Sequence, residues 1–148
     1  MSLPHAVPAP PWSRSRGRRL LGPGLTAAGV GLAALALRLR DPHQPGSWGF
    51  CPFRLLTGLD CPLCGGLRAV NDLTHGDIVA AASSNLLFVV SIPLLVLIWT
   101  RWVGRAWDGA PAAAGPSRRE VFYGNVALAV TGVFWVVRNL PVASWLAS

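Results

Sequence analysis

Residues Val79 to Thr100 read VAAASSNLLFVVSIPLLVLIWT, an apolar run of 22 residues that carries no charged side chain. About 20 consecutive apolar residues are needed for a helix to cross the hydrocarbon core of a bilayer. Asp77 stands just before the run, where its carboxylate is placed to accept the first free backbone N–H groups of a helix. Pro93 lies inside the run and is expected to kink it, because proline removes a backbone hydrogen bond. The run therefore predicts a transmembrane helix.

Two weaker apolar runs flank this one. Leu20 to Leu37 contains 18 uncharged residues, and Val121 to Val137 contains 17. Both are close to the lower limit of about 17 residues for a spanning helix. The chain is 52% hydrophobic and only 13% charged, whereas soluble domains carry about 25% charged residues. We expect an all-α integral membrane protein with about three transmembrane helices, not a soluble enzyme.

The amino-terminal part divides at the first apolar run. Residues 1–19 are rich in proline and arginine and lack an apolar period, so we expect a disordered, basic, cytoplasmic tail. Residues 20–148 are expected to form a single membrane domain. Ala34–Ala36 resembles a signal-peptide cleavage site, and Arg18–Arg19 before an apolar run resembles a twin-arginine export signal. Arg38 and Arg40 favour an uncleaved anchor, because positive charge directly after a cleavage site disfavours export.

The arginines predict both the partner and the orientation. The net charge is +7, but the arginines flank the apolar runs and form no single patch, so we expect contact with the lipid bilayer and not with nucleic acid. Cytoplasmic loops of membrane proteins are enriched in basic residues. The four arginines before the first run and the four between the second and third runs therefore indicate the cytoplasmic side. These two sets are Arg14, Arg16, Arg18 and Arg19, and Arg101, Arg105, Arg118 and Arg119. The loop 41–78 is therefore expected to be extracytoplasmic.

The most distinctive segment lies between the first and second runs. It contains all three cysteines, Cys51, Cys61 and Cys64, in the spacing C-x9-C-x2-C. Proline is favoured in a first helical turn, so Pro62 predicts a short interfacial helix from about Leu63 to Thr74. Helical spacing aligns a polar stripe that runs away from the cysteines. The stripe consists of Arg68, Asn71, Asp72 and His75. Asn85, a polar residue of the next apolar run, is a further candidate for contact with a partner.

These residues resemble a known family. The string CPFRLLTGLDCPLCGGLRA beginning at Cys51, followed by HGD and by Asn85 at the head of an apolar run, is similar to the bacterial membrane family called domain of unknown function 2752. The resemblance covers the chain from Cys51 to about Trp102. Leu67 and Leu86 stand where that family usually has threonine and proline. The resemblance implies location in a bacterial plasma membrane, and it implies no activity.

The cysteines permit three kinds of chemistry. A disulfide between Cys51 and either Cys61 or Cys64 would brace a loop in an oxidising compartment. Alternatively, the Cys-x-x-Cys pair would perform thiol redox chemistry, with Cys61 as the attacking thiolate. Zinc coordination by the three cysteines and His75 is the third interpretation. A continuous helix from Cys64 to His75 would separate these two ligands by roughly 16 Å, so a fourth ligand would have to come from Asp60, from a partner chain or from a broken helix.

Signatures of the common enzyme classes are absent from the sequence, including Ser-His-Asp, HExxH and P-loop patterns. No catalytic residue is therefore assigned, and no cofactor is expected unless zinc binds. The preferred hypothesis is a non-catalytic accessory or scaffold protein that contacts other membrane subunits or a second copy through Trp48, Arg68 and Asp72. The alternative is a membrane thiol-redox or zinc-handling protein that uses the Cys-Pro-x-Cys motif.

Overall fold

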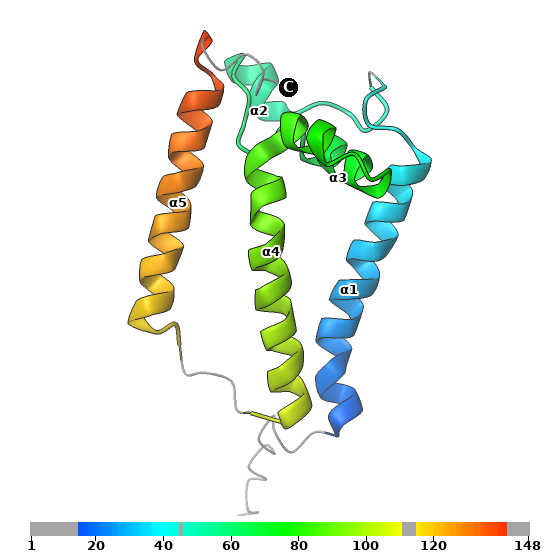
Figure 1. Ribbon diagram of the computed structural model, residues 1–148, viewed down its shortest axis with the longest axis vertical. Coiled ribbons are helices and arrows are strands. Elements are labelled where there is room, and N and C mark those ends of the chain that lie inside the picture. The colour runs from blue at the N-terminus through cyan, green and yellow to red at the C-terminus, as the bar shows by residue number, and fades with distance from the viewer. Residues whose placement is uncertain (1–14, 45, 111–114, 142–148) are drawn as a thin grey trace, which may run out of the picture.

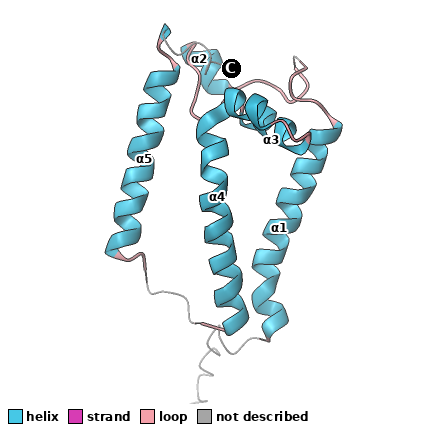
Figure 2. Ribbon diagram, in the orientation of Figure 1, coloured by secondary structure: helices cyan, strands magenta, loops and turns pink. Residues whose placement is uncertain are grey.

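The computed structural model describes residues 15–44, 46–110 and 115–141. These residues form five helices and no strand (Figures 1 and 2). Three of the helices, α1, α4 and α5, are long and apolar enough to cross a membrane. The predicted all-α membrane architecture, with a cysteine-bearing loop between the first and second spans, is therefore confirmed. The helices are α1 (Arg16–Leu39), α2 (Pro52–Thr57), α3 (Gly66–Thr74), α4 (Ile78–Asp108) and α5 (Arg118–Arg138).

Each long helix contains its predicted apolar run and extends beyond it. Hydropathy detects only the apolar middle of such a helix, whereas the backbone continues until a terminating signal. Gly109 supplies that signal for α4 by adopting a φ of 72°, which is easiest for glycine. Ser117 and Glu120 form a reciprocal capping box at the start of α5. Residues 16–19, which were assigned to the tail, form the first turn of α1, and residues 1–14 of that tail lie outside the described residues.

The long helices are arranged as one close pair and one separate helix. In Figure 1, α1 (blue) runs beside α4 (green), and α3 lies across the end of this pair. Near the other end, the indole Nε1 of Trp99 donates a hydrogen bond of 3.2 Å to the carbonyl of Pro23. A Cβ atom at Gly22 would lie 3.0 Å from the Trp102 ring, so the missing side chain permits this close contact. Helix α5 makes little contact with the other helices along its length.

Helix α4 consists of two helical parts joined at Asn85. Asp77 caps the first part as predicted, because its Oδ1 accepts from the backbone N–H of Ala80 at 2.8 Å. Asn85 has the non-helical dihedrals φ −161° and ψ 94°, and its Oδ1 accepts from the Phe88 N–H at 2.9 Å. Asn85 therefore acts as the amino-terminal cap of the second, longer part. Pro93 lies inside the second part with helical dihedrals, and the kink expected there stays a prediction.

Helix α3 begins at Gly66, three residues later than the predicted start at Leu63. The cause is Gly65, whose φ of 79° is incompatible with a continuing helix. The preceding residues form a tight turn instead, in which the Cys64 N–H donates to the Cys61 carbonyl at 3.1 Å. Side chains then fasten α3 to the end of α1. The Asn71 amide donates to the Leu37 carbonyl at 2.7 Å, which satisfies a carbonyl in the last turn of α1.

Candidate functional site: a three-cysteine cluster

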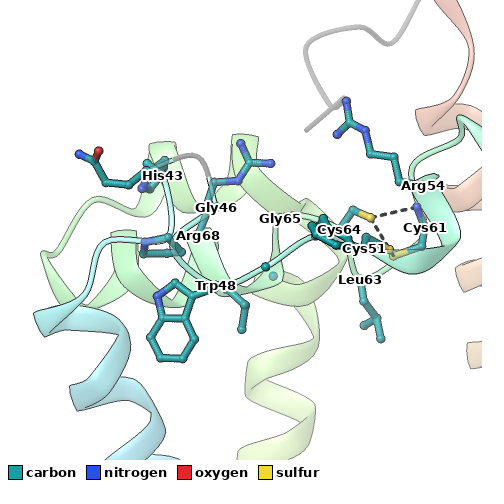
Figure 3. A pocket seen from close by; sticks show the side chains of 16 residues that line it. His43, Gly46, Trp48, Cys51, Arg54, Cys61, Leu63, Cys64, Gly65 and Arg68 are labelled. Carbon is teal, nitrogen blue, oxygen red and sulfur yellow. Dashed lines mark hydrogen bonds between the residues drawn. The ribbon is translucent and has the colours of Figure 1, made fainter.

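The three cysteine side chains lie close together near the amino-terminal end of α4, on the side that faces α5 (Figure 3). Cys51 precedes α2, while Cys61 and Cys64 belong to the turn before α3. The Cys61 sulfur lies 2.9 Å from the Cys64 sulfur and 3.7 Å from the Cys51 sulfur. All three sulfur atoms lie within 4.8 Å of one another. We call these residues the cysteine cluster.

The break in α4 positions the turn that carries Cys61 and Cys64. The Asn85 amide donates to the carbonyl of Pro62 at 2.9 Å and to that of Cys64 at 3.0 Å. Its side chain is nearly fully buried, with a residue exposure of 1%. One asparagine therefore caps a membrane helix and holds the cysteine turn at the same time. A Cβ atom at Gly65 would lie only 2.2 Å from the Ser84 carbonyl oxygen, so this packing requires glycine.

The carboxyl end of α5 contacts the segment directly before Cys61. The Asn139 side chain exchanges two hydrogen bonds of 2.9 Å with the backbone of Asp60, directly before Cys61. Arg138 is buried, with a side-chain exposure of 0%, and its Nε lies 3.8 Å from the Asp60 carboxylate. That carboxylate also forms an ion pair of 2.9 Å with Arg54. The Nη2 atom of Arg138 also donates to the Ser84 carbonyl, at 3.4 Å.

The cysteine cluster contains thiols of unequal acidity. The backbone N–H of Arg54 holds the pKa of the Cys51 thiol below its ordinary value, against a smaller effect of desolvation. Burial raises the pKa of the Cys64 thiol to about 12, and its contact with Cys61 acts in the same direction. Cys51 is therefore the more acidic and the more accessible of these two thiols. A bound metal cation would override this difference, because coordination deprotonates a thiol.

A pocket of about 890 Å³ opens onto the cysteine cluster. Its volume lies in the range of about 300–1,000 Å³ that is typical of ligand sites. Figure 3 shows the cysteines and Arg54 at one end of the pocket and His43, Trp48 and Arg68 toward the other. The residues that line it include two arginines and a histidine, but neither aspartate nor glutamate.

The structure brings together only part of the predicted site. Asn71, Asp72 and Asn85 are buried, and each forms a hydrogen bond inside the chain. The Asp72 carboxylate accepts from the Ser84 hydroxyl at 2.9 Å. His75 lies at the far end of α3, where its Nδ1 is 2.9 Å from the Asn71 carbonyl, and it is not part of the cysteine cluster.

Sequence reasoning missed two residues of the site, Arg138 and Asn139, which stand at the end of the third apolar run. The number of spans was a signal for them, because the carboxyl end of a third span lies on the same side of the membrane as the loop between the first two spans. A polar Arg-Asn pair at that end can therefore meet the loop. Its contact with Asp60 carried no local signal.

The fold and the site together define a class of protein. The chain is a small all-α membrane protein that carries three clustered cysteines at one end of its helices. Residues 51–99 match the family model described as protein of unknown function, DUF2752. This match confirms the resemblance inferred from the cysteine motifs, and it covers all three cysteines and most of α4. No curated protein and no solved structure matches the chain.

Proposed function

We propose that the protein binds a thiophilic metal ion, such as zinc, through Cys51, Cys61 and Cys64 at the membrane surface. The observation that carries the proposal is the convergence of three sulfur atoms within 4.8 Å. Thiolate ligands select zinc and other soft metals. Zinc–sulfur bonds of about 2.3 Å place tetrahedral thiolates about 3.8 Å apart. The observed separations of 2.9 and 3.7 Å approach that arrangement with small side-chain rotations.

The number of thiols also supports a metal ion. A disulfide would join two of the three sulfurs and leave the third cysteine as a free thiol beside it. A single metal ion would engage all three. The short separation of Cys61 and Cys64 is compatible with either outcome, but the position of Cys51, 3.7 Å from Cys61, is most simply explained by a shared ligand.

Charge balance supports the same proposal. Three thiolates around a divalent ion carry a formal net charge of about −1. A buried cation beside such a centre offsets that charge, and Arg138 is the buried cation here. Its Nε and Nη1 atoms donate no hydrogen bond within the part of the chain that the structure describes. With neutral thiols, the charged partner of Arg138 would be the Asp60 carboxylate, which Arg54 also contacts, and its Nη2 atom would still donate to the Ser84 carbonyl at 3.4 Å.

The distribution of arginines supports a location for this site. The amino end of α1, the carboxyl end of α4 and the amino end of α5 lie at one end of the molecule, and the cysteine cluster lies at the other (Figure 1). Basic residues favour the cytoplasmic side. We therefore place the cysteine cluster on the extracytoplasmic side of a bacterial plasma membrane.

Native mass spectrometry of the protein in detergent tests the metal proposal. Protein purified under reducing conditions and given zinc should carry one zinc ion, and a chelator should remove it. Cys64→Ser should lose the zinc, whereas His75→Ala should keep it, because His75 lies outside the cysteine cluster. A zinc-free protein lighter by two hydrogens, with that mass restored by reductant, would establish a disulfide and contradict the proposal.

One observation favours a second candidate function, that of a non-catalytic accessory subunit. Helix α5 is held at its carboxyl end and makes little contact with the other described helices along its length. Its apolar sides are therefore available to another membrane protein. Native mass spectrometry after extraction in mild detergent would show a partner of fixed stoichiometry. A protein that always appears alone would argue against this role.

A further inference from the structure

We propose that the metal in the cysteine cluster has an open fourth position, and that this position accepts the sulfur of a small external thiol that carries a carboxylate. This inference rests on the proposed metal function and names the ligand class for the same site. The carboxylate of that ligand would bind Arg68 across the pocket. The geometry that carries the inference is the juxtaposition of three sulfurs and an arginine in one cavity.

The fourth position is open because the chain supplies three ligands. Among the described residues, the group that could hold a metal here consists of the three cysteines alone. The nearby carboxylate of Asp60 is engaged by Arg54 and lies close to Arg138. Structural zinc sites use four protein ligands, whereas sites with three keep a position for water or substrate. A centre of this composition is therefore built to exchange a ligand.

The pocket gives that position access to a molecule larger than water. All three cysteines line the same cavity of about 890 Å³, together with the small residues Gly46, Gly49 and Gly66. A Cβ atom at any of these glycines would meet no other atom within 4 Å. Space therefore extends from the sulfur atoms toward His43 and Arg68 at the other end (Figure 3).

Charge selects an anionic ligand. The described residues that line the pocket include no aspartate or glutamate, so among them only the proposed metal-bound thiolates carry negative charge. His43 already contacts Asp41 at 2.8 Å and Asp72 at 3.4 Å. Arg54 pairs with Asp60. Arg68 is half-buried, and among the residues that the structure describes it forms no ion pair, which leaves its planar guanidinium for bidentate contact with a ligand carboxylate.

The reacting end of the ligand is a thiol because the metal is already bound by sulfur. Soft thiolate donors suit the metals that a cysteine site selects. On binding, the thiol loses its proton to solvent and one metal-bound water leaves, so the metal keeps four ligands. The added negative charge lies between Arg138, beside the cluster, and Arg68, in the pocket wall.

Cobalt substitution tests the inference on the full chain in detergent. Sulfur-to-cobalt charge-transfer absorption reports how many thiolates bind the ion. We expect reduced glutathione, a thiol with two carboxylates, to raise this absorption and to bind more tightly than 2-mercaptoethanol, which has none. S-methylglutathione, which lacks the thiol, should leave the absorption unchanged. Arg68→Gln should weaken the binding of glutathione by at least about tenfold, which corresponds to the loss of at least one charge-assisted hydrogen bond, and leave that of 2-mercaptoethanol unaltered.

The controls separate this inference from the metal proposal. Arg101→Gln changes an arginine at the other end of α4 and should bind glutathione like the unaltered protein. Cobalt that binds without a spectral response to any thiol, or equal affinities of both thiols in protein with and without Arg68, would overturn the inference alone. Removal of cobalt from the protein by the thiols would also overturn it, and the cobalt that the protein retains after desalting measures this. Failure to bind cobalt at all would overturn the metal proposal itself.

Discussion

At the scale of single residues, the cysteine turn and the break in α4 depend on a contact between backbones. Gly65 approaches the Ser84 carbonyl so closely that a Cβ atom would lie 2.2 Å from its oxygen. The non-helical dihedrals of Asn85 redirect the chain at this point, and its side chain binds two carbonyls of the turn. The position of Cys64 is therefore determined by its neighbours in space more than by its neighbours in sequence.

Gly65→Ala tests this contact. Both the steric clash and the positive φ oppose the substitution, and a left-handed backbone alone costs about 1–3 kcal/mol for a residue other than glycine. We expect a lower temperature of unfolding in detergent and loss of zinc from the native mass spectrum. Gly66→Ala is the matched control, since its Cβ atom would meet nothing within 4 Å and alanine favours a helix. Equal stability of the two variants would contradict this account.

Alkylation tests the unequal thiols. In reduced, metal-free protein at neutral pH, we expect iodoacetamide to modify Cys51 before Cys64, because the thiolate is the reactive form. The lowered pKa of Cys51 increases its thiolate fraction, whereas the raised pKa of Cys64, about 12, suppresses it. Cys64 should react faster as the pH rises toward that value. Peptide mass spectrometry would measure both rates, and faster reaction of Cys64 at neutral pH would refute the assignment.

At the scale of elements, the attachment of α5 depends on its carboxyl end. Asn139 forms two hydrogen bonds with the backbone of Asp60, and the ring of Trp135 meets that of Phe53 edge-on at 6.1 Å. Lipid is as apolar as the sides of the helix, so a hydrophobic driving force does not hold α5 against its neighbours. Polar contacts at the helix end must do so.

Asn139→Ala should therefore loosen α5 without unfolding it. Loss of two partly buried hydrogen bonds is expected to cost about 1–3 kcal/mol. Backbone amides around Asp60 should then exchange hydrogen faster in mass-spectrometric exchange measurements, while those in the middle of α4 should not change. Asn125→Ala alters an exposed asparagine of the same helix and serves as the control. Unchanged exchange at Asp60 would show that other contacts hold α5.

At the scale of the whole molecule, three spans place the cysteine cluster and the carboxyl end of α5 at the same end (Figure 1). This arrangement makes the site dependent on all parts of the membrane domain. Asn71 connects α3 to α1, Asn85 connects the cysteine turn to α4, and Asn139 connects the segment before Cys61 to α5. Three asparagines thus join the loop to each span in turn.

The orientation can be measured because the chain contains no lysine. A single lysine introduced as Gln44→Lys, at the same end of the molecule as the cysteine cluster, should react with a membrane-impermeant amine reagent on intact cells. Ala110→Lys, at the opposite end of the molecule, should react only after the membrane is opened. This result follows from the excess of arginine at that end. The reverse pattern would place the cysteine cluster in the cytoplasm.

The sequence alone determined the three spans, the short helix and the capping role of Asp77. Hydropathy and helical spacing are local properties, so they can be evaluated without knowledge of the fold. The later start of α3 and the break at Asn85 were not predicted, because they depend on the approach of Gly65 to Ser84. The sequence also revealed the cysteine motifs, but it left the pairing of the sulfurs open.

Only the tertiary structure brought Cys51 to the Cys-x-x-Cys pair and Arg138 to their side. The nine residues between Cys51 and Cys61 permit many separations, and spacing cannot select one of them. Arg138 lies 74 positions after Cys64 in the chain, and its burial depends on how the end of α5 packs on the loop. Contacts between segments that are distant in sequence form only in the folded chain, and these contacts determine which side chains surround the sulfurs.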